Sequence, residues 1–272
     1  MPITVRTYGD SGAPVFVFHG GPGAQGSVAP VARALADAFT VFEPLQRRAG
    51  DEPLTVAGHI ADLHEVIHLH APGSRPALVG ASWGAMLAMA YAAEHPDTAG
   101  PIVLIGTGTY EAKARSRLLE NLAERMTPAF RQQLEQAARD HSDPDDALRA
   151  QGRLFSTIYN VDPLEPDDQS VPLDARGHEQ TDADWSRLRD EGVYPAAFTA
   201  ITSPVLMLHG AYDPHPGALI RDSLLPFVPQ LEYHEWPNAG HDLWLERHIR
   251  DDFFMVLRAW LLGHLTTLSP SS

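Results

Sequence analysis

Short apolar runs alternate along the chain with stretches in which apolar residues recur every three or four positions. The runs that predict buried strands cover residues 15–18, 40–43, 77–80, 102–105, 205–208 and 231–233. The helical periodicity covers residues 31–39, 60–67, 83–94, 219–227 and 243–262. Strands that alternate with helices predict an α/β fold with a mostly parallel central sheet and helices on both of its faces. Such sheets place their functional sites at the carboxyl ends of the strands.

The stretch of residues 109–194 interrupts this alternation, because it contains no convincing strand pattern. Thr127 and Asp143 are each followed by proline, the arrangement of a helix N-cap with proline at the first helical position. A further short helix is expected from Asp184 to Asp190. We therefore expect two parts, a core domain of residues 1–108 and 195–272 and an inserted helical cap of residues 109–194.

Net charge restricts the partners that the protein can bind. The 272 residues carry a formal charge of −15, and since a phosphate backbone is bound by clustered Lys and Arg, we expect no nucleic-acid partner. An acidic surface also disfavours an anionic membrane, and no apolar run approaches the roughly 18 residues that span a bilayer. Between Asp140 and Glu191 there are 14 acidic and 5 basic residues, a net charge of −9. Most of the imbalance therefore lies in the expected cap.

Other site chemistries find little support. The chain has no cysteine, which excludes disulfides, zinc–thiolate sites and a thiol nucleophile. The glycines near residue 20 do not form the G-x-G-x-x-G dinucleotide pattern, so we expect no cofactor. His64 and His68 share a helix face with His59 and His70 nearby, but a zinc site needs a further ligand with a defined approach. We expect surface histidines and no metal. The N-terminus lacks the apolar core of a signal peptide, and we expect a cytoplasmic protein.

A nucleophile motif lies between the strand at 77–80 and the helix that begins at Trp83. Gly80-Ala-Ser82-Trp-Gly84 has the form G-x-S-x-G, in which a serine occupies a tight strand-to-helix turn in strained backbone geometry. The two glycines remove side chains that would crowd this turn. The positive end of the following helix points at the oxyanion that develops during acyl transfer. The motif predicts Ser82 as a catalytic nucleophile.

A glycine-rich loop follows the strand at 15–18 and predicts an oxyanion hole. Acyl transfer needs two backbone N–H groups aimed at one oxygen, one from the residue after the nucleophile and one from the loop after an early strand. We expect Trp83 and Gly21, in the loop His19-Gly-Gly-Pro-Gly23, to supply them. His19 is expected to organise this loop and not to act as a base.

The remaining two catalytic residues are expected late in the chain. Asp213 lies just beyond the strand at 205–208, and His241 lies in a loop after the last strand. In this architecture the order is nucleophile, acid, base, so we expect His241 to take the serine proton and Asp213 to fix its tautomer. Glu43 and Asp62 do not fit that order. Asp242, next to the histidine, is expected to be structural.

Together these residues resemble the α/β-hydrolase superfamily over nearly the whole chain. Within it, the sequence looks most like the proline iminopeptidase group of serine peptidases. The likeness lies in His19-Gly-Gly-Pro-Gly23, in Ser82-Trp83-Gly84, in Tyr91 and in the turn His95-Pro96. The group typically has GGSWG at the elbow, where this chain has Gly80-Ala-Ser82-Trp-Gly84. The resemblance also implies a helical cap over the site.

The expected function is hydrolysis of an ester or amide of a small molecule or short peptide through an acyl-enzyme. The narrower hypothesis is an aminopeptidase that acts on an N-terminal residue such as proline. Cap carboxylates would then bind the free amine, and the candidates are Glu165, Asp167, Asp168 and Glu179. The alternatives are a small-molecule esterase, lactonase or thioesterase, and a non-catalytic ligand-binding homologue. The natural substrate and the oligomeric state do not follow from the sequence.

Overall fold

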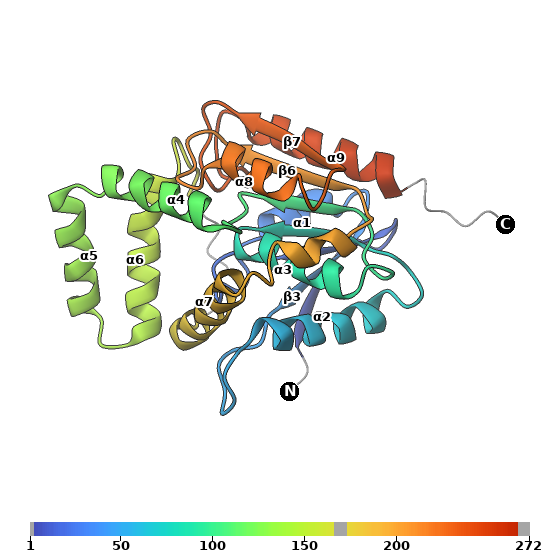
Figure 1. Cartoon of the computed structure of the whole chain (residues 1–272), viewed down its shortest axis with the longest axis horizontal. Helices are drawn as coiled ribbons and strands as arrows, with labels where there is room; N and C mark the ends of the chain where they lie inside the picture. The colour runs from blue at the N-terminus through green and yellow to red at the C-terminus, as the bar shows by residue number, and fades with distance from the viewer. Residues whose placement is uncertain (1–2, 166–172, 266–272) are drawn as a thin grey trace.

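A computed structural model describes residues 3–165 and 173–265 (Figure 1). These residues form one sheet of seven strands: β1 (Thr4–Tyr8), β2 (Pro14–Phe18), β3 (Thr40–Leu45), β4 (Ala77–Ala81), β5 (Ile102–Ile105), β6 (Val205–Gly210) and β7 (Leu231–Trp236). The strand order is β1-β3-β2-β4-β5-β6-β7, and every neighbouring pair is parallel except β1 with β3. The prediction of a mostly parallel α/β sheet is therefore confirmed. The sequence pattern does not mark the edge strand β1.

The inner strands are buried on both faces, which explains why they read as continuous apolar runs. Val15 and Val17 of β2 face the layer made by α1 (Ala29–Leu35) and α9 (Arg250–Leu265). Phe16 and Phe18 face the opposite layer. That layer consists of α2 (Val56–His70), α3 (Trp83–Glu94) and α8 (Gly217–Leu224). Because helices cover both faces of the sheet, polar residues have room at the carboxyl ends of the strands.

Between β5 and β6 the chain forms the inserted helical segment, residues 109–194. It contains α4 (Ala112–Arg125), α5 (Pro128–Asp140), α6 (Pro144–Tyr159) and α7 (Ala175–Asp190), and the short helix η1 (Ala196–Ala200) follows it. In Figure 1, α5 and α6 stand side by side and project away from the sheet. The two predicted N-caps are confirmed, since the side chain of Thr127 accepts from Phe130 N and that of Asp143 accepts from the backbone N–H groups of Asp145 and Asp146. The division into a core domain and a cap stays a prediction.

Two helix boundaries differ from the predicted ones. α7 begins at Ala175 and not at Asp184, because its buried side consists of Gly177, Thr181 and Trp185, a stripe too polar to show helical periodicity. α9 begins at Arg250 and not at Leu243, because residues 243–249 form turns that bond to Asp162 and Leu164, just after α6. Within residues 3–165 and 173–265, no helix has both the length and the apolar character needed to cross a bilayer.

Candidate active site

Ser82 lies at the turn from β4 into α3, in a backbone conformation that residues other than glycine rarely adopt. Its φ is 52° and its ψ is −116°, and it is the only non-glycine residue with positive φ in the described part of the chain. Its backbone N–H donates to the carbonyl oxygen of Ile105 at 2.8 Å, which ties the turn to the end of β5. Its side chain is partly exposed, whereas Ala81 and Trp83 on either side are buried. The turn therefore presents the hydroxyl group at the carboxyl edge of the sheet.

The two glycines of the motif are required by backbone packing. A Cβ atom on Gly84 would overlap the carbonyl oxygen of Phe18, and one on Gly80 would overlap the carbonyl oxygen of Gly84. No rotamer can relieve an overlap with backbone atoms. The sharp turn at Ser82 thus depends on both glycines.

The glycine-rich loop after β2 lies against the serine. A Cβ atom on Gly20 would be 3.2 Å from the Cβ atom of Ser82. Gly21 has a φ of 40° and starts a turn in which Ala24 N donates to its carbonyl oxygen at 2.8 Å. Trp83 is the first residue of α3, and the first N–H groups of a helix lack partners within the helix. Trp83 thus follows Ser82 directly, and Gly21 follows the glycine that lies against Ser82. The role of Gly21 and Trp83 as oxyanion donors stays a prediction.

His19 is fully buried below this loop. Its Nδ1 donates to the carbonyl oxygen of Gly20 at 3.0 Å. Burial lowers the pKa of His19 to about 4, so the ring is neutral at physiological pH. This geometry agrees with a residue that organises the loop.

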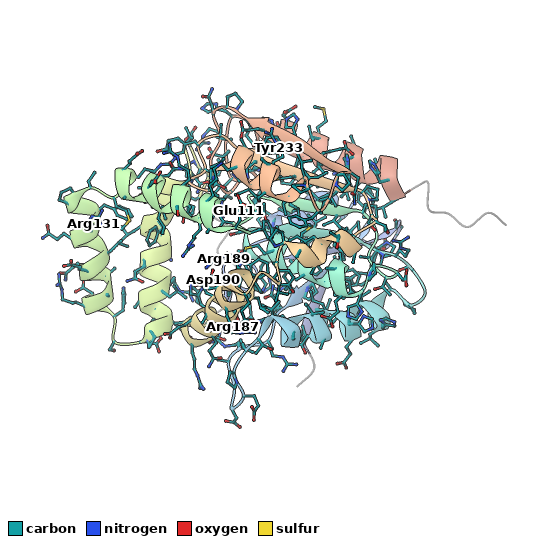
Figure 2. The ribbon with its side chains drawn as sticks, in the orientation of Figure 1. Glu111, Arg131, Arg187, Arg189, Asp190 and Tyr233 are labelled. Carbon is teal, nitrogen blue, oxygen red and sulfur yellow. The ribbon has the colours of Figure 1, made fainter. Side chains whose placement is uncertain are left out.

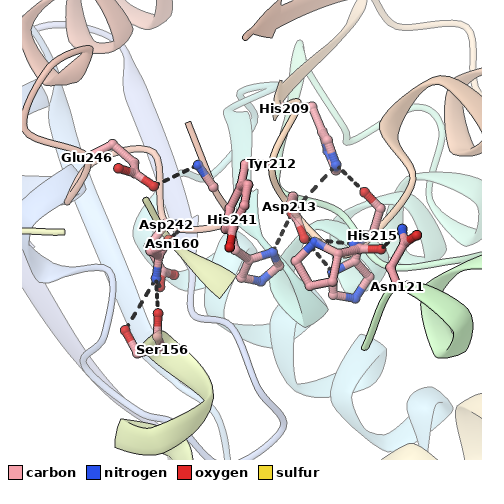
Figure 3. Close-up of polar contacts among 12 residues, drawn as sticks. Asn121, Ser156, Asn160, His209, Tyr212, Asp213, His215, His241, Asp242 and Glu246 are labelled. Atoms are coloured by element: carbon pink, nitrogen blue, oxygen red, sulfur yellow. Dashed lines mark hydrogen bonds and ion pairs between the residues drawn. The ribbon is translucent and has the colours of Figure 1, made fainter. Parts of the chain in front are cut away.

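Asp213 lies in the turn after β6, and its buried carboxylate accepts hydrogen bonds from two imidazoles (Figure 3). His241 Nδ1 donates to Oδ2 at 2.6 Å. His215 donates to Oδ1 from both its backbone N and its Nδ1, each at 2.9 Å. His209 Nε2 lies 3.5 Å from Oδ2 and donates to the carbonyl oxygen of His215 at 2.9 Å. The structure thus brings the expected acid and base into direct contact.

The charges of this cluster shift the pKa values of Asp213 and His241 in opposite directions. Burial by itself raises the pKa of Asp213, but the surrounding imidazoles of His241, His215 and His209 reverse this and hold the pKa far below its usual range. Burial by itself lowers the pKa of His241, but the Asp213 carboxylate and its hydrogen bond raise that pKa above the ordinary value. Asp213 therefore stays ionised and stabilises the imidazolium that a general base becomes.

His241 and Ser82 both lie against the carboxyl end of β5. A Cβ atom on Gly106 would be 3.1 Å from His241 Nδ1, and Gly106 follows Ile105, which accepts the Ser82 N–H. The hydrogen bonds of the described residues join His241 to Asp213 but not to Ser82. In enzyme structures without substrate, hydrogen bonds between catalytic groups are often long or poorly aligned.

The end of α6 holds the loop that carries His241, and sequence reasoning missed the residues that do so. His241 N donates to the carbonyl oxygen of Tyr159 at 3.0 Å, and the Tyr159 ring meets the imidazole edge-on at 5.3 Å. The side chain of Asn160 bonds to Asp242. The buried carboxylate of Glu246 accepts from the backbone N–H groups of Gly240, Val161 and Asp162 at 2.7–3.0 Å. No local pattern marks the bonds of Asn160 to Asp242 or of Glu246 to Val161 and Asp162, because these partners lie about 80 positions apart.

Helix α4 holds the loop that carries Asp213. Asn121 Nδ2 donates to the carbonyl oxygen of Pro214 at 2.8 Å, and Arg125 donates to that of Tyr212 at 2.6 Å. Arg125 also donates to the carbonyl oxygen of Ile158 at 2.7 Å. The inserted helical segment therefore supports both the acid loop and the base loop.

The rival carboxylates lie elsewhere, as the sequence order implies. Glu43 in β3 accepts from the Tyr8 hydroxyl at 2.7 Å, and Asp62 in α2 pairs with Arg47. Asp242 is structural, since its carboxylate accepts from Asn160 Nδ2 at 2.9 Å.

The acidic residues of the inserted segment serve mainly its own architecture. Asp143 and Asp174 accept from backbone N–H groups at helix starts, and Asp184 accepts from Val56 N. At the end of α7, shown in Figure 2, Arg187 pairs with Glu191 and Asp184, and Arg189 pairs with Asp190. Of the candidate amine-binding residues, Glu165 and Glu179 are exposed, and Asp167 and Asp168 lie outside the described residues.

The histidines of α2 form no metal cluster within the described residues, but one of them is not on the surface as expected. His59 is buried and bonds to Thr181 at 3.1 Å, because α7 covers that side of α2. In the described chain, Asp213, His215 and His241 form the only group of three or more potential metal ligands whose donor atoms all lie within 4.8 Å of one another. The hydrogen bonds of the two imidazoles to Asp213 account for that spacing, and we assign them no metal.

Comparison with known proteins agrees with this fold. A family model described as alpha/beta hydrolase fold matches residues 13–247. A probable proline iminopeptidase of Streptomyces coelicolor is 32% identical over 150 residues, which are 49% of this chain and 46% of that protein. The match thus spans about half the length of this curated relative. The predicted resemblance to the superfamily and the predicted likeness to the proline iminopeptidase group are both confirmed.

Solved structures of several hydrolases have the same architecture. The proline iminopeptidase of Mycobacterium smegmatis superposes with a TM-score of 0.66 at 21% identity, over 97% of this chain and 96% of that one. An esterase of Exiguobacterium antarcticum superposes with a TM-score of 0.70 at 18% identity, over 96% and 95% of the two chains. Identities this low show a common fold and leave the substrate open.

Proposed function

Because the chain belongs to the α/β-hydrolase fold family, we propose that it is a serine hydrolase that cleaves an ester or amide through an acyl-enzyme. Ser82 is the nucleophile, His241 the general base and Asp213 the acid that orients it. The observation that carries this proposal is the 2.6 Å bond from His241 Nδ1 to Asp213 at the sheet edge where the elbow presents Ser82.

The arrangement supplies each step of acyl transfer. The bond to Asp213 commits His241 Nδ1 and leaves Nε2 to take the proton from Ser82 Oγ as that oxygen attacks the carbonyl carbon. The N–H groups of Gly21 and Trp83 stabilise the resulting oxyanion. The proton on Nε2 then passes to the leaving group, whose bond to the carbonyl carbon breaks. A water molecule, activated by the same imidazole, hydrolyses the acyl-enzyme and restores Ser82.

For the substrate we propose an N-terminal residue such as proline in a short peptide or amide. The support is the similarity to a probable proline iminopeptidase together with the loop His19-Gly-Gly-Pro-Gly23 and the acidic cap. The second candidate is a small-molecule ester, lactone or thioester. It is favoured by the observation that the cap carboxylates described above are bonded within the protein or exposed.

The mechanism is tested by covalent labelling with a fluorophosphonate probe followed by peptide mapping. We expect the label on Ser82 in the wild-type protein and no label in Ser82→Ala, with unchanged circular dichroism. A wild-type protein that stays unlabelled, or a Ser82→Ala variant with full turnover, would refute the proposal and favour a non-catalytic ligand-binding protein.

The substrate class is tested with a prolyl arylamide, its N-acetyl derivative and a short-chain acyl aryl ester. A charge-assisted bond to a free amine contributes about 1.5–3 kcal/mol. N-acetylation should therefore lower kcat/KM by roughly tenfold to a hundredfold for an aminopeptidase. Equal or faster cleavage of the acetylated compound rejects the aminopeptidase and supports the esterase.

A further inference from the structure

The carboxylate of Asp213 is shared by two imidazoles in matching positions. His241 Nδ1 bonds to one oxygen at 2.6 Å and His215 Nδ1 bonds to the other at 2.9 Å. The two rings stack with centroids 4.9 Å apart and an interplanar angle of 23°. Their side chains are 11% and 12% exposed, so the environments are similar as well. The acyl-transfer mechanism uses only one of them.

The His215 side chain is not needed to keep the carboxylate in place. The backbone N–H of His215 already donates to Asp213 Oδ1 at 2.9 Å, in a local turn that any residue except proline can form at this position. His241 holds the other oxygen. The imidazole of His215 is therefore an additional donor to a carboxylate that is already oriented.

We propose that His215 is a positioning residue that takes up part of the charge of Asp213 and thereby sets the pH range over which His241 is an unprotonated base. This inference rests on the proposed serine hydrolase function. A neutral imidazole that donates to Oδ1 draws electron density from the carboxylate. The carboxylate then stabilises protonated His241 less strongly, and His241 becomes a competent base at lower pH.

The groups around His215 agree with a neutral donor. Burial lowers the pKa of His215, against the raising effect of Asp213. From β6, His209 Nε2 donates to the His215 carbonyl oxygen at 2.9 Å. From α6, the Tyr159 ring packs edge-on against His215 at 5.8 Å.

Further charges reach the cluster through its neighbours. The positive charges of Arg115 and Arg125, both on α4, and the negative charge of Asp242 act on Tyr159. Asp242 also acts on His241. Among the described residues, Asp213 is the one carboxylate that bonds to the His215 ring.

The side-chain effect can be separated from structure with three substitutions. His215→Phe keeps a flat ring for stacking but removes the donor, and His215→Leu also removes it in case the larger ring does not fit. His215→Asn places an amide nitrogen where Nδ1 was and keeps a donor that does not titrate. His141→Phe, at an exposed position after α5, is the matched control.

The first measurement is kcat/KM against pH, for the substrate that Ser82 turns over best. We expect His215→Phe and His215→Leu to move the acid limb upward by about half a pH unit or more, with an alkaline plateau near that of the wild-type enzyme. His215→Asn and His141→Phe should keep the wild-type limb. A limb that stays in place or moves downward in the Phe and Leu variants overturns the inference, as does an equal shift in the Asn variant.

The second measurement needs no turnover. Titration of His241 by NMR in histidine-labelled protein should show the same upward shift of its midpoint in the Phe and Leu variants only. If neither the wild-type protein nor any variant turns over substrate or labels at Ser82, the proposed function fails, whereas the NMR midpoint of His241 still decides the charge sharing. If Ser82-dependent turnover is present but the Phe and Leu variants keep the wild-type midpoints of the acid limb and of the NMR titration, the inference alone fails.

Discussion

Asn160 and Asp242 are joined by two reciprocal hydrogen bonds between the end of α6 and the loop of the candidate base. Asn160 Nδ2 donates to Asp242 Oδ2 at 2.9 Å, and Asp242 N donates to Asn160 Oδ1 at 2.9 Å (Figure 3). His241 is the residue immediately before Asp242, and its own N–H donates to the carbonyl oxygen of Tyr159. The position of the imidazole therefore depends on the inserted helical segment.

This pair predicts that Asn160→Ala lowers kcat more than it changes KM. Loss of both bonds leaves the buried loop less well held, and a small displacement of a catalytic group costs rate steeply, here roughly tenfold or more. Stability should fall by about 1–3 kcal/mol in urea denaturation, because the partly buried N–H and carboxylate of Asp242 lose their partners. Asn238→Ala, at an exposed position after β7, is the control and should change neither value. An unchanged kcat in Asn160→Ala would contradict the link.

Asp213→Asn should reduce kcat by about four orders of magnitude with the fold intact. The amide can donate to His241 Nδ1 and so favours the tautomer in which Nε2 carries the proton and cannot accept one from Ser82. Steady-state kinetics and the rate of fluorophosphonate labelling should fall together. A variant with more than a tenth of wild-type activity would show that another group orients His241.

The wild-type pH profile should have its acid limb above the ordinary imidazole pKa of about 6.5. Asp213 raises the pKa of His241, and as pH falls through that pKa the imidazole becomes protonated and can no longer act as a base. Activity is therefore complete on the alkaline side and lost toward acid. The measurement is kcat/KM against pH with the Ser82→Ala background subtracted. A limb centred near 5 would assign the essential base to another group.

Two glycine substitutions should have opposite effects. Gly84→Ala brings a methyl group into the carbonyl oxygen of Phe18, so the elbow must shift, and both stability and labelling of Ser82 should fall. Gly152→Ala lies in α6 with open space at its Cβ position. It should stabilise the protein by about 0.5–1 kcal/mol because alanine favours a helix over glycine. Thermal unfolding of both variants checks the pair, and a Gly84→Ala protein with normal labelling would contradict the packing argument.

Some features of the fold follow from local pattern alone. The strand at Ile102–Ile105 and the helix at Trp83–Glu94 have the predicted bounds. The caps at Thr127 and Asp143 act on N–H groups only two or three positions away. Such features are readable because the residues that cause them are near neighbours in the chain, where spacing and side-chain type are enough.

The sequence by itself determined the strands of the sheet other than β1, the elbow at Ser82 and the candidate acid and base, since each has a local signature in a predictable place. Only the tertiary structure decided that His215 shares Asp213 and that Asn160 bonds to Asp242. It also decided that α7 buries His59. The bonds of Asn160 and His59 depend on how helices α6 and α7 return to the sheet after long connections. His215 is only two positions from Asp213, but spacing alone does not show that the turn after β6 aims its imidazole at the carboxylate that also binds His241. A hydrogen bond between residues about 80 or 120 positions apart leaves no periodic trace in the chain.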